Sequence, residues 1–519
     1  MQDGPSRPRL KGDVRNSNGQ AHQPPSPPRL NSRPTLTTDM SHPSIPEIID
    51  GLSAQLKLDT SGVPLEVTGQ DPVSQSTHRI GDACAAALAV AATSISKLSK
   101  ERGLDVGAIK ISVEDAILQL TAAFVTKLQG VGMMHFFEDP TLFRDSDFYP
   151  AKGGRNIFLL LTYPPLRAAA CQVLNCPPSR KDYADRISKL DAFELEEKIN
   201  NGGGCAVAVR TRKEWAEHAQ GQALAAQDLI IIEKLGDSKP ENLSTLKPDE
   251  LPLKGIRVLD NGHVIAAPML ARMMAEFGST VLRISSPDHP DSPAMLNETG
   301  IGKKMAFCDM TSDVGRKGFT ETIADADVYI CNYRSLEKKG YAPEDLARMR
   351  PGIIFVDYSG WGRKGPWHEA NWGGFDQLAC SASGFSEEEG SFAAPKLPPT
   401  YLMNDYLAPI LGLAAVSTLL SRRAKEGGSY VIRLNLCKIA MWVQGLGAFS
   451  HEQVQQLPKI DHDKLAAGRL TKVKGPNGTS EYLPTCLQFD KIRPHFKFGA
   501  EPAGASNLSF AEVEDALNA

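Results

Sequence analysis

Features that define several common protein classes are missing from this 519-residue chain. Its nine cysteines are scattered and form no C-x-x-C pair, so we expect free thiols in a reducing compartment rather than a disulfide framework. Lysine and arginine number 57 against 61 acidic residues, a formal charge of −4 that gives no support for a nucleic-acid partner. The longest apolar stretches, Ala83–Ala92 and Tyr406–Leu420, fall short of the roughly 18–20 residues that a membrane span needs. With no secretory signal or lipidation motif visible, the sequence predicts a soluble, cytoplasmic protein, and organelle targeting stays open.

Standard nucleotide and hydrolase motifs are also absent. There is no G-x-G-x-x-G after a strand, no P-loop and no G-x-S-x-G elbow. Asp461-His462-Asp463 is the one tight cluster of metal-ligand residue types, and it lies in a polar stretch that favours a solvated loop. We therefore expect no metal.

What is present is an ordinary globular composition, with 41% hydrophobic residues and 44 glycines, and an uneven distribution of proline. Nine of the 36 prolines fall in residues 1–46, where almost no apolar side chain accompanies them. Such a segment cannot repay its ordering entropy, which predicts disorder. The predicted organisation is a proline-rich N-terminal arm and lead-in (1–70), a first globular segment (71–240), a linker (241–252), a large domain (253–440) and a C-terminal segment packing back on the large domain (441–519).

Residues 253–440 alternate between short apolar runs and helical patterns. This alternation is typical of parallel strands joined by helices. It predicts an α/β fold with a Rossmann-like, doubly wound parallel sheet, and the first globular segment predicts a smaller α+β domain. The expected strands of the large domain are 255–260, 280–284, 328–331, 353–358 and 430–436, and the expected helices are 268–277, 315–324, 343–350 and 406–423. Before the large domain we expect helices at 82–98, 164–174, 182–197 and 210–220 and strands at 108–113, 156–162 and 229–233, and near the C-terminus a helix at 510–517.

The chain contains an internal similarity. Residues 82–117 align without a gap with residues 405–440, and seven positions are identical, among them Asp82 and Asp405. Each copy reads as an acidic helix start, an apolar small-residue helix, a turn and a strand. We interpret this as a partial internal duplication.

Asp405 is the most interesting single residue in this pattern, because it opens an apolar helix. Its carboxylate is expected to cap that helix by accepting backbone N–H groups. The helix N-terminus would then keep the carboxylate ionised, and an ionised carboxylate is an acceptable nucleophile.

Several short stretches of the region 251–440 carry a resemblance by their order rather than by one motif. These are Leu253–Asp260, His263–Pro268, Ala275–Gly278, Gly302–Lys304, Asp309-Met310, Ala326–Val328, Asn332–Arg334, Gly360–Gly362, Gly365–Trp367 and Gly374–Gln377. In this order they resemble the family III CoA-transferases, which include formyl-CoA and carnitine-CoA transferases and α-methylacyl-CoA racemase (the CaiB/BaiF family).

The resemblance implies an enzyme that moves CoA between an acyl-CoA donor and a carboxylic acid, with coenzyme A as part of its substrates. Asp405 stands in the position of the family's catalytic aspartate and would form an aspartyl-CoA thioester. The loop of His263, Val264, Ile265 and Ala266 matches the family's CoA-contacting stretch. Lys303, Lys304 and the turn of Asn332, Tyr333 and Arg334 are the expected partners of CoA, with the cationic groups on its phosphates.

The sequence also departs from the family. Phe375 replaces the histidine that serves racemases as a second base, and Ser285-Ser286 replaces a basic residue after the second strand. An acyl-CoA racemase or lyase-like enzyme and a catalytically silent CoA-binding relative therefore stay open as alternatives.

The order of parts is unusual as well. Residues 74–240 resemble the family's later portion, with Phe148–Leu161 and Thr211–Trp215 matching its small domain, although they precede the large domain here. The chain resembles a truncated first copy, in which Asp82 is expected to be a helix cap, fused to a second copy. Family members dimerise, so either a homodimer or an intrachain pseudo-dimer is expected.

Overall fold

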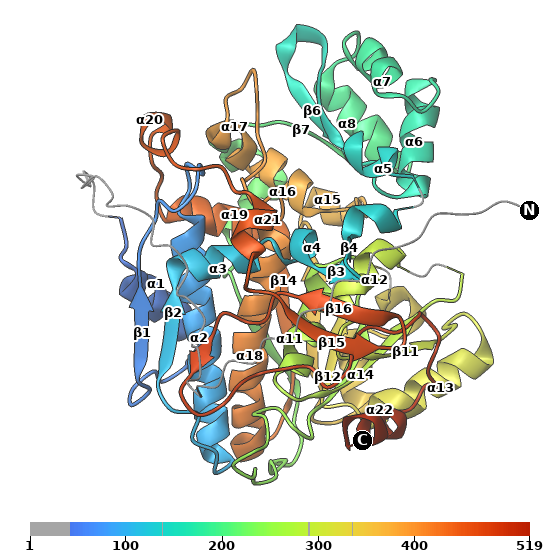
Figure 1. Ribbon diagram of the computed structural model, residues 1–519. Helices are drawn as coiled ribbons and strands as arrows, with labels where there is room; N and C mark the ends of the chain where they lie inside the picture. The colour runs from blue at the N-terminus through green and yellow to red at the C-terminus, as the bar shows by residue number, and fades with distance from the viewer. Residues whose placement is uncertain (1–41, 138, 289–290, 335, 519) are drawn as a thin grey trace, which may run out of the picture. The chain divides into compact units, whose positions relative to one another are not determined.

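The computed structural model describes residues 42–518 except 138, 289–290 and 335 (Figure 1). The predicted proline-rich arm falls almost wholly in residues 1–41, outside the described residues. The lead-in that follows is ordered: helix α1 (Ile45–Leu56) begins with a capping box made by Ser44 and Glu47, and strand β1 (Leu65–Thr68) follows it. The segment that ends at the predicted boundary, residue 70, therefore contains a helix and a strand.

The largest sheet has seven strands, and the six that belong to the predicted large domain run parallel. Numbered along the chain within that domain, their order across the sheet is 3-2-1-4-5-6, which is the Rossmann order. The seventh strand, β8, joins the edge antiparallel to β14. The strands in spatial order are β11 (Lys304–Phe307), β10 (Thr280–Ser285), β9 (Arg257–Asn261), β12 (Val328–Cys331), β13 (Ile354–Ser359), β14 (Ser429–Asn435) and β8 (Ile231–Gly236). The predicted doubly wound α/β fold is confirmed.

Helices cover both faces of this sheet, because alternate strand residues enter two separate cores. Val258 packs into the cluster that contains α11 and α18, whereas its neighbour Leu259 packs with α13, α14 and α22 on the other face. Both residues are fully buried, as parallel strands covered on both sides require. The helices are α11 (Ala266–Glu276), α12 (Pro293–Thr299), α13 (Asp313–Ala324), α14 (Pro343–Met349), α18 (Asn404–Glu426) and α22 (Phe510–Asn518).

Two long helices, α2 (Ile80–Glu101) and α18, pack side by side, with α1 against α2. Both are long and apolar enough to span a membrane by length and composition alone, which the sequence reading did not expect. Most of each helix is buried inside the protein, and small residues such as Ala87 and Ala414 have no exposed surface. Their apolar character is accounted for by this packing.

A separate three-stranded antiparallel sheet carries the predicted small α+β unit. It has its own core, centred on Tyr149, Ile157 and Tyr183. The prediction of a single helix at 182–197 is wrong, because the first helix ends at Ile187. Asp191 then caps a second helix by accepting the N–H groups of Phe193 and Glu194. The elements are α5 (Thr141–Arg144), β5 (Asp147–Pro150), η2 (Lys152–Gly154), β6 (Asn156–Leu159), α6 (Pro164–Leu174), α7 (Arg180–Ile187), α8 (Ala192–Asn201) and β7 (Ala206–Ala208).

The helix expected at 210–220 is likewise two helices, α9 (Arg212–Glu217) and α10 (Ala219–Ala225). The break lies at His218, whose backbone is extended and whose ring accepts the N–H of Gln220. The other short elements are β2 (Ile109–Ser112), α3 (Val113–Gln119), α4 (Ala122–Val125), β3 (Lys127–Leu128), β4 (Val131–Gly132), η1 (Met133–Phe136), η3 (Glu337–Lys339), α15 (Pro366–Glu369), α16 (Asp376–Ser383), α17 (Phe385–Glu389) and α19 (Leu436–Gly445).

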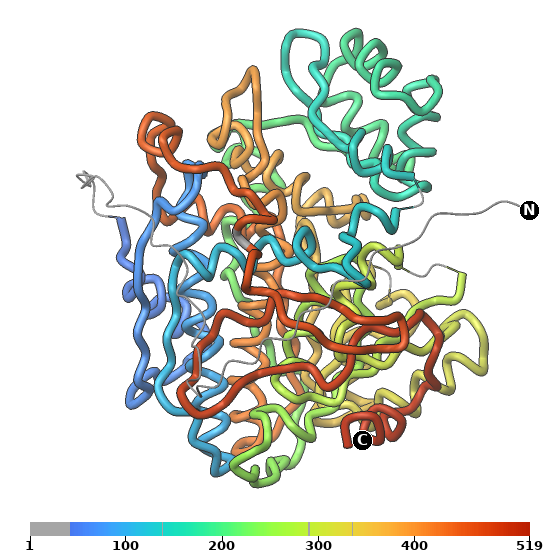
Figure 2. Tube along the Cα trace, viewed as in Figure 1, coloured from blue at the N-terminus to red at the C-terminus, as the bar shows by residue number. Residues whose placement is uncertain are grey.

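The C-terminal chain connects the first globular segment with the large domain, as the red trace of Figure 2 shows. Its hairpin, β15 (Thr471–Gly475) and β16 (Gly478–Tyr482), pairs with β3, while β17 (Gln488–Phe489) pairs with β2. Helix α22 packs against β10, and the short helices α20 (His451–Val454) and α21 (His462–Ala466) precede the hairpin. The segment thus contacts both halves, and the predicted domain boundaries and the duplication stay predictions.

Candidate active site

A cavity of about 580 Å³ opens at the carboxyl ends of the parallel strands. Its wall includes the loops that follow β9, β12, β13 and β14, together with the start of α18. The chain leaves β9 toward β10 on one side and β12 toward β13 on the other, so the cavity lies at the switch point of the sheet. Open α/β sheets bind ligands at this position. A further part of the wall comes from the small α+β unit, through Tyr163–Leu166 and Cys205.

Asp405 lines this cavity, but it does not cap its own helix as the sequence reading expected. It is the second residue of α18, and the residue at the N-cap position is Met403. The carboxylate of Asp376 caps the helix instead: it accepts the N–H groups of Met403 at 3.0 Å and Asp405 at 2.8 Å and the side-chain amide of Asn404 at 3.1 Å. Among the described residues, no donor reaches the carboxylate oxygens of Asp405 itself.

The electrostatics of Asp405 also differ from the expectation. Burial and then the neighbouring charge of Asp376 raise the pKa of Asp405 well above its ordinary 3.8, so the helix N-terminus does not dominate. Burial likewise raises the pKa of Asp376 to about 6, although its three donors oppose the shift. Because those donors favour the ionised form of Asp376, Asp405 is the carboxyl group of the pair that holds a proton more readily.

The loop His263–Ala266 lines the cavity beside Asp405 and is held rigidly. The His263 N–H donates to Asn332 Oδ1 at 2.9 Å, and the Asn332 amide donates back to the His263 carbonyl at 2.8 Å. Val264 has a φ of 68°, which is strained for a β-branched residue, and its N–H faces both oxygens of Asp291 at 3.2 and 3.3 Å. Asp291 also pairs with the His263 imidazole and with Arg283.

The predicted turn of Asn332, Tyr333 and Arg334 lines the same cavity. The Tyr333 ring lies over the ring of His263, with centroids 6.0 Å apart. The Arg334 guanidinium donates to the carbonyl of Asn371, and no ion pair with a carboxylate engages it among the described residues. An unpaired guanidinium at the mouth of a cavity suits an anionic ligand group.

The two lysines predicted to contact the CoA phosphates do not line this cavity, and the prediction for Lys303 is corrected. Lys303 has no exposed surface, and its ammonium donates to Asp260 Oδ2 and to the Pro268 carbonyl, both at 2.6 Å. Its ammonium is therefore part of a core ion pair with Asp260 of β9 and does not face the cavity. Lys304 donates to Glu501 Oε2 at 3.1 Å, which ties β11 to the C-terminal segment.

The sequence reading missed the aromatic part of the wall, which comprises Tyr163, Tyr358, Trp361 and Trp372. Phe375, noted only as a replaced histidine, also lines the cavity. The glycines at 360 and 374, which the family resemblance did mark, lie back to back: a Cβ on Gly374 would come within 2.6 Å of the Gly360 Cα. The family motifs thus pointed at this wall without showing which side chains face inward.

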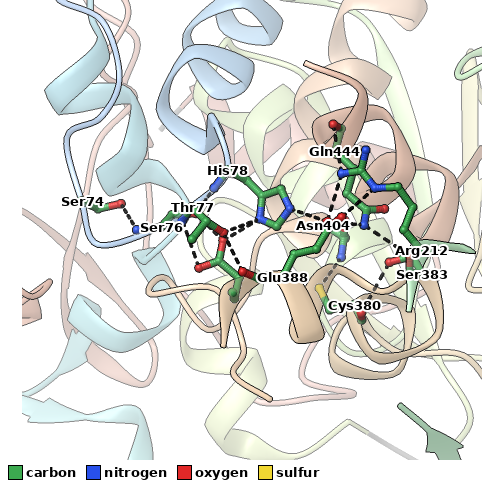
Figure 3. A network of polar contacts seen from close by, with 11 residues as sticks. Ser74, Ser76, Thr77, His78, Arg212, Cys380, Ser383, Glu388, Asn404 and Gln444 are labelled. Carbon is green, nitrogen blue, oxygen red and sulfur yellow. Dashed lines mark hydrogen bonds and ion pairs between the residues drawn. The ribbon is translucent and has the colours of Figure 1, made fainter. Parts of the chain in front are cut away.

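A buried polar network, drawn in Figure 3, involves residues of α16 and α17. His78 has a fully buried ring that lies 2.7 Å from Glu389 Oε1 and 2.8 Å from Glu388 Oε2. Burial alone would lower the pKa of His78, but the hydrogen bonds to both carboxylates outweigh it and raise the pKa. Gln444 donates to Glu388 and to the carbonyl of Ser383, the last residue of α16. This network fixes α16, whose first residue is the capping Asp376.

Within the described part of the chain, no group of three or more His, Cys, Asp or Glu side chains could hold a metal ion. The Asp461-His462-Asp463 cluster lies at the start of α21, where Asp461 caps the helix by accepting the N–H of Lys464 at 3.1 Å.

Comparison with known proteins finds a family match over part of the chain. Residues 253–471 match the family model described as CoA-transferase family III. This region of the chain is therefore a CoA-transferase family III domain, which confirms the resemblance.

Curated relatives carry related names. An acetyl-coenzyme A transferase, nodX, of Hypoxylon pulicicidum is 27% identical over 328 residues, covering 59% of this chain and 54% of the relative. The alpha subunit of succinyl-CoA–L-malate CoA-transferase of Chloroflexus aurantiacus is 32% identical over 206 residues, covering 36% of this chain and 47% of that protein. The chain thus spans about half the length of these relatives. Among solved structures, a CAIB/BAIF family protein from Brucella suis matches with 21% identity and a TM-score of 0.34, covering 44% of this chain and 65% of that one.

Proposed function

We propose that this protein transfers CoA between an acyl-CoA and a carboxylic acid, with Asp405 as the covalent nucleophile. The observation that carries the proposal is the position of Asp405: a carboxylate without a hydrogen-bond donor lies in the same cavity as the His263 loop and the Asn332–Arg334 turn. A nucleophile left unpaired is free to attack, whereas a carboxylate in an ion pair must first break that pair.

The reaction divides into four acyl-transfer steps, in each of which a carboxylate or a thiolate attacks a carbonyl carbon. An Asp405 oxygen attacks the thioester carbonyl, the C–S bond breaks, and CoA thiolate leaves a mixed anhydride. The thiolate then attacks the Asp405 carbonyl carbon, which releases the donor acid and forms an aspartyl-CoA thioester. The acceptor carboxylate attacks this thioester to give a second anhydride and thiolate. Attack of the thiolate on the acceptor carbonyl releases the new acyl-CoA and restores Asp405, with no net proton change.

The environment of Asp405 suits these steps. Burial leaves Asp405 only 7% exposed, and limited contact with water protects anhydrides from hydrolysis. The raised pKa makes the ionised carboxylate a more basic nucleophile. We further propose that the His263–Ala266 loop and Arg334 contact CoA, since both lie in the wall next to Asp405.

The test is direct trapping of the enzyme intermediate. Purified protein is incubated with acetyl-CoA or succinyl-CoA, the donors named for its relatives, and a panel of carboxylic acids, and is then quenched with hydroxylamine or borohydride. Mass spectrometry should find the modification at Asp405, and Asp405→Asn should abolish both adduct and exchange. Asp313→Asn is the matched control, because that carboxylate is 95% exposed on α13.

Two other outcomes contradict the proposal in distinguishable ways. Epimerisation of a 2-methylacyl-CoA without exchange would favour the racemase alternative, although Phe375 lines the cavity where a second base is expected. Binding of CoA without adduct or exchange across the panel would favour a silent CoA-binding relative. The homodimer or intrachain pseudo-dimer and the cytoplasmic location stay predictions.

A further inference from the structure

Tyr163 contributes to the cavity wall from outside the family-matched region and carries a polar group that the mechanism above does not use. It precedes helix α6 in the small α+β unit, about 90 residues before the match begins at 253, and its side chain lines the cavity with Asp405. Its hydroxyl is buried and has no hydrogen-bond partner among the described residues. A buried hydroxyl left unpaired costs roughly 1–3 kcal/mol, so its retention calls for an explanation.

The position of the Tyr163 ring is well defined. The residue has extended backbone and is followed by Pro164 and Pro165, which restrict its conformation and begin α6. Its ring centroid lies 5.7 Å from that of His263 and 6.1 Å from that of Phe375. The ring therefore lies between the rigid loop after β9 and the start of α16, the helix whose first residue, Asp376, caps α18.

The charges around the hydroxyl keep it a donor. Burial, then the nearby carboxylates of Asp291 and Asp405, raise the pKa of Tyr163 well above its ordinary 10.0. The phenol thus stays protonated in the working pH range, and its proton is available for a hydrogen bond.

The two tryptophan donors of the cavity wall are already engaged. The Trp361 indole N–H donates to the Gly373 carbonyl and the Trp372 indole N–H to Asn201 Oδ1, each at 2.9 Å. The Arg363 guanidinium holds both oxygens of Asp357. Tyr163 differs from these residues because its donor points to no protein acceptor among the described residues.

We propose that the Tyr163 hydroxyl donates a hydrogen bond to the acyl oxygen of the thioester that Asp405 attacks. This inference rests on the proposed function. As the Asp405 oxygen bonds to the carbonyl carbon, negative charge grows on the carbonyl oxygen, and the phenol stabilises it without giving up its proton. When the C–S bond breaks, the carbonyl re-forms and the hydrogen bond weakens again. The segment before the family domain would then supply a catalytic residue to that domain.

The first test is the Tyr163→Phe variant, which removes only the hydroxyl. We expect kcat to fall by about 10²-fold, the scale for losing one oxyanion donor, with the KM for acyl-CoA changed only a few-fold. The midpoint temperature of thermal unfolding should be unchanged or slightly higher, because an unpaired buried hydroxyl has been removed. Tyr183→Phe is the control: this tyrosine is fully buried in the core of the same unit and its hydroxyl faces Cys171 at 3.4 Å, away from the cavity. A Tyr163→Phe enzyme with wild-type kcat would overturn the inference while leaving the role of Asp405 intact.

A second measurement does not need turnover. In the Asp405→Asn background, calorimetric titration with acetyl-CoA and with S-ethyl-CoA, which has no carbonyl, compares binding with and without Tyr163→Phe. Loss of the hydroxyl should weaken acetyl-CoA by about two- to tenfold and leave S-ethyl-CoA unchanged. Equal effects on the two ligands would refute the contact to the acyl oxygen, whether or not the protein proves to be a transferase.

Discussion

Replacing Lys303 by methionine tests whether this lysine belongs to the core or to the ligand site. The sequence resemblance assigned it to the CoA phosphates, whereas its ammonium lies 2.6 Å from Asp260 Oδ2 and has no exposed surface. Methionine keeps the apolar stem of the side chain and removes the charge and both hydrogen bonds. Asp260 would then keep Arg283, 3.8 Å away, and the N–H of Gly262, and the carbonyl of Pro268 would lose the ammonium donor.

The expected loss of stability is large because both partners are buried. Breaking a buried ion pair from one side typically costs about 3–5 kcal/mol, since the remaining charge stays out of water. The matched control is Lys317→Met on α13: this side chain is 76% exposed and 3.8 Å from Glu321, a surface pair for which at most about 1 kcal/mol is expected. Removing both charges, with Lys303→Met and Asp260→Asn together, should recover part of the loss. The buried charge is then gone, and the amide oxygen introduced by Asp260→Asn can still accept the N–H of Gly262.

The assay is urea unfolding followed by tryptophan fluorescence, together with the KM for acyl-CoA. We expect Lys303→Met to lower the free energy of unfolding by about 3–5 kcal/mol, and the KM of the folded fraction to stay within a few-fold of wild type. A Lys303→Met protein with unchanged stability and a KM raised tenfold or more would refute the reasoning, because it would place the ammonium on the ligand.

Two predictions concern pH. Asp376→Asn removes the charge that helps to raise the pKa of Asp405, so the acid limb of kcat/KM should move to lower pH, and an unmoved limb would exclude this coupling. In the His78 cluster, the raised pKa of His78 supplies stability that is complete below its unfolded pKa of 6.5 and is lost as pH rises through the folded value. Burial would raise the pKa of Glu388, but hydrogen bonds from His78 and Arg212 lower it to about 2. The lowered pKa contributes stability that is complete above pH 4.5 and is lost as the pH falls toward 2. Denaturant titrations from about pH 5 to about pH 9 should therefore show a decline on the alkaline side that Glu388→Gln reduces, and an equal decline in that variant would contradict the assignment.

The parallel sheet could be predicted from the sequence because its strands are continuous apolar runs. The strand at 328–331 and the helix at 164–174 have the expected bounds, and β9, β10, β13 and β14 lie within two residues of theirs. Helix breaks were harder, because they depend on single capping contacts such as that of Asp191. The hairpin β15–β16 escaped prediction because its residues are largely polar and its pairing with β3 joins chain positions far apart.

The part of the site that is built from loops after neighbouring parallel strands could be predicted from the sequence. Loops after neighbouring parallel strands must meet at one edge, which brings His263 and Asn332 together. Lys303 was misplaced because glycine and lysine in a motif do not reveal whether the side chain turns inward. Tyr163 could not be found, because nothing local to the sequence of the small unit shows which distant helix start it faces.

The two aspartates of the internal similarity show why only one of them is a candidate nucleophile. At both helix starts a second carboxylate accepts the aspartate's own N–H at 2.8 Å: Asp71 serves Asp82, and Asp376 serves Asp405. Asp82, however, has no free oxygen and no exposed surface, since one oxygen accepts the N–H of Asp71 and the other accepts two bonds from Arg79. The expectation that Asp82 caps its own helix is thus corrected to a buried ion pair.

Extending the 323-residue offset of the internal similarity three residues back from Asp82 shows what differs at the second helix start. It places Leu402 opposite Arg79, so no guanidinium is available three residues before Asp405. Leu402 is buried and offers no donor, and Asp405 therefore keeps an unpaired carboxylate that is 7% exposed, toward the cavity. Burial and then the charge of Asp376 raise the pKa of Asp405, whereas Asp82 lies in an ion pair with Arg79 at 2.6 Å. The side chain three residues before the aspartate therefore distinguishes the two helix starts: Arg79 holds Asp82 in an ion pair, whereas Leu402 leaves Asp405 without one.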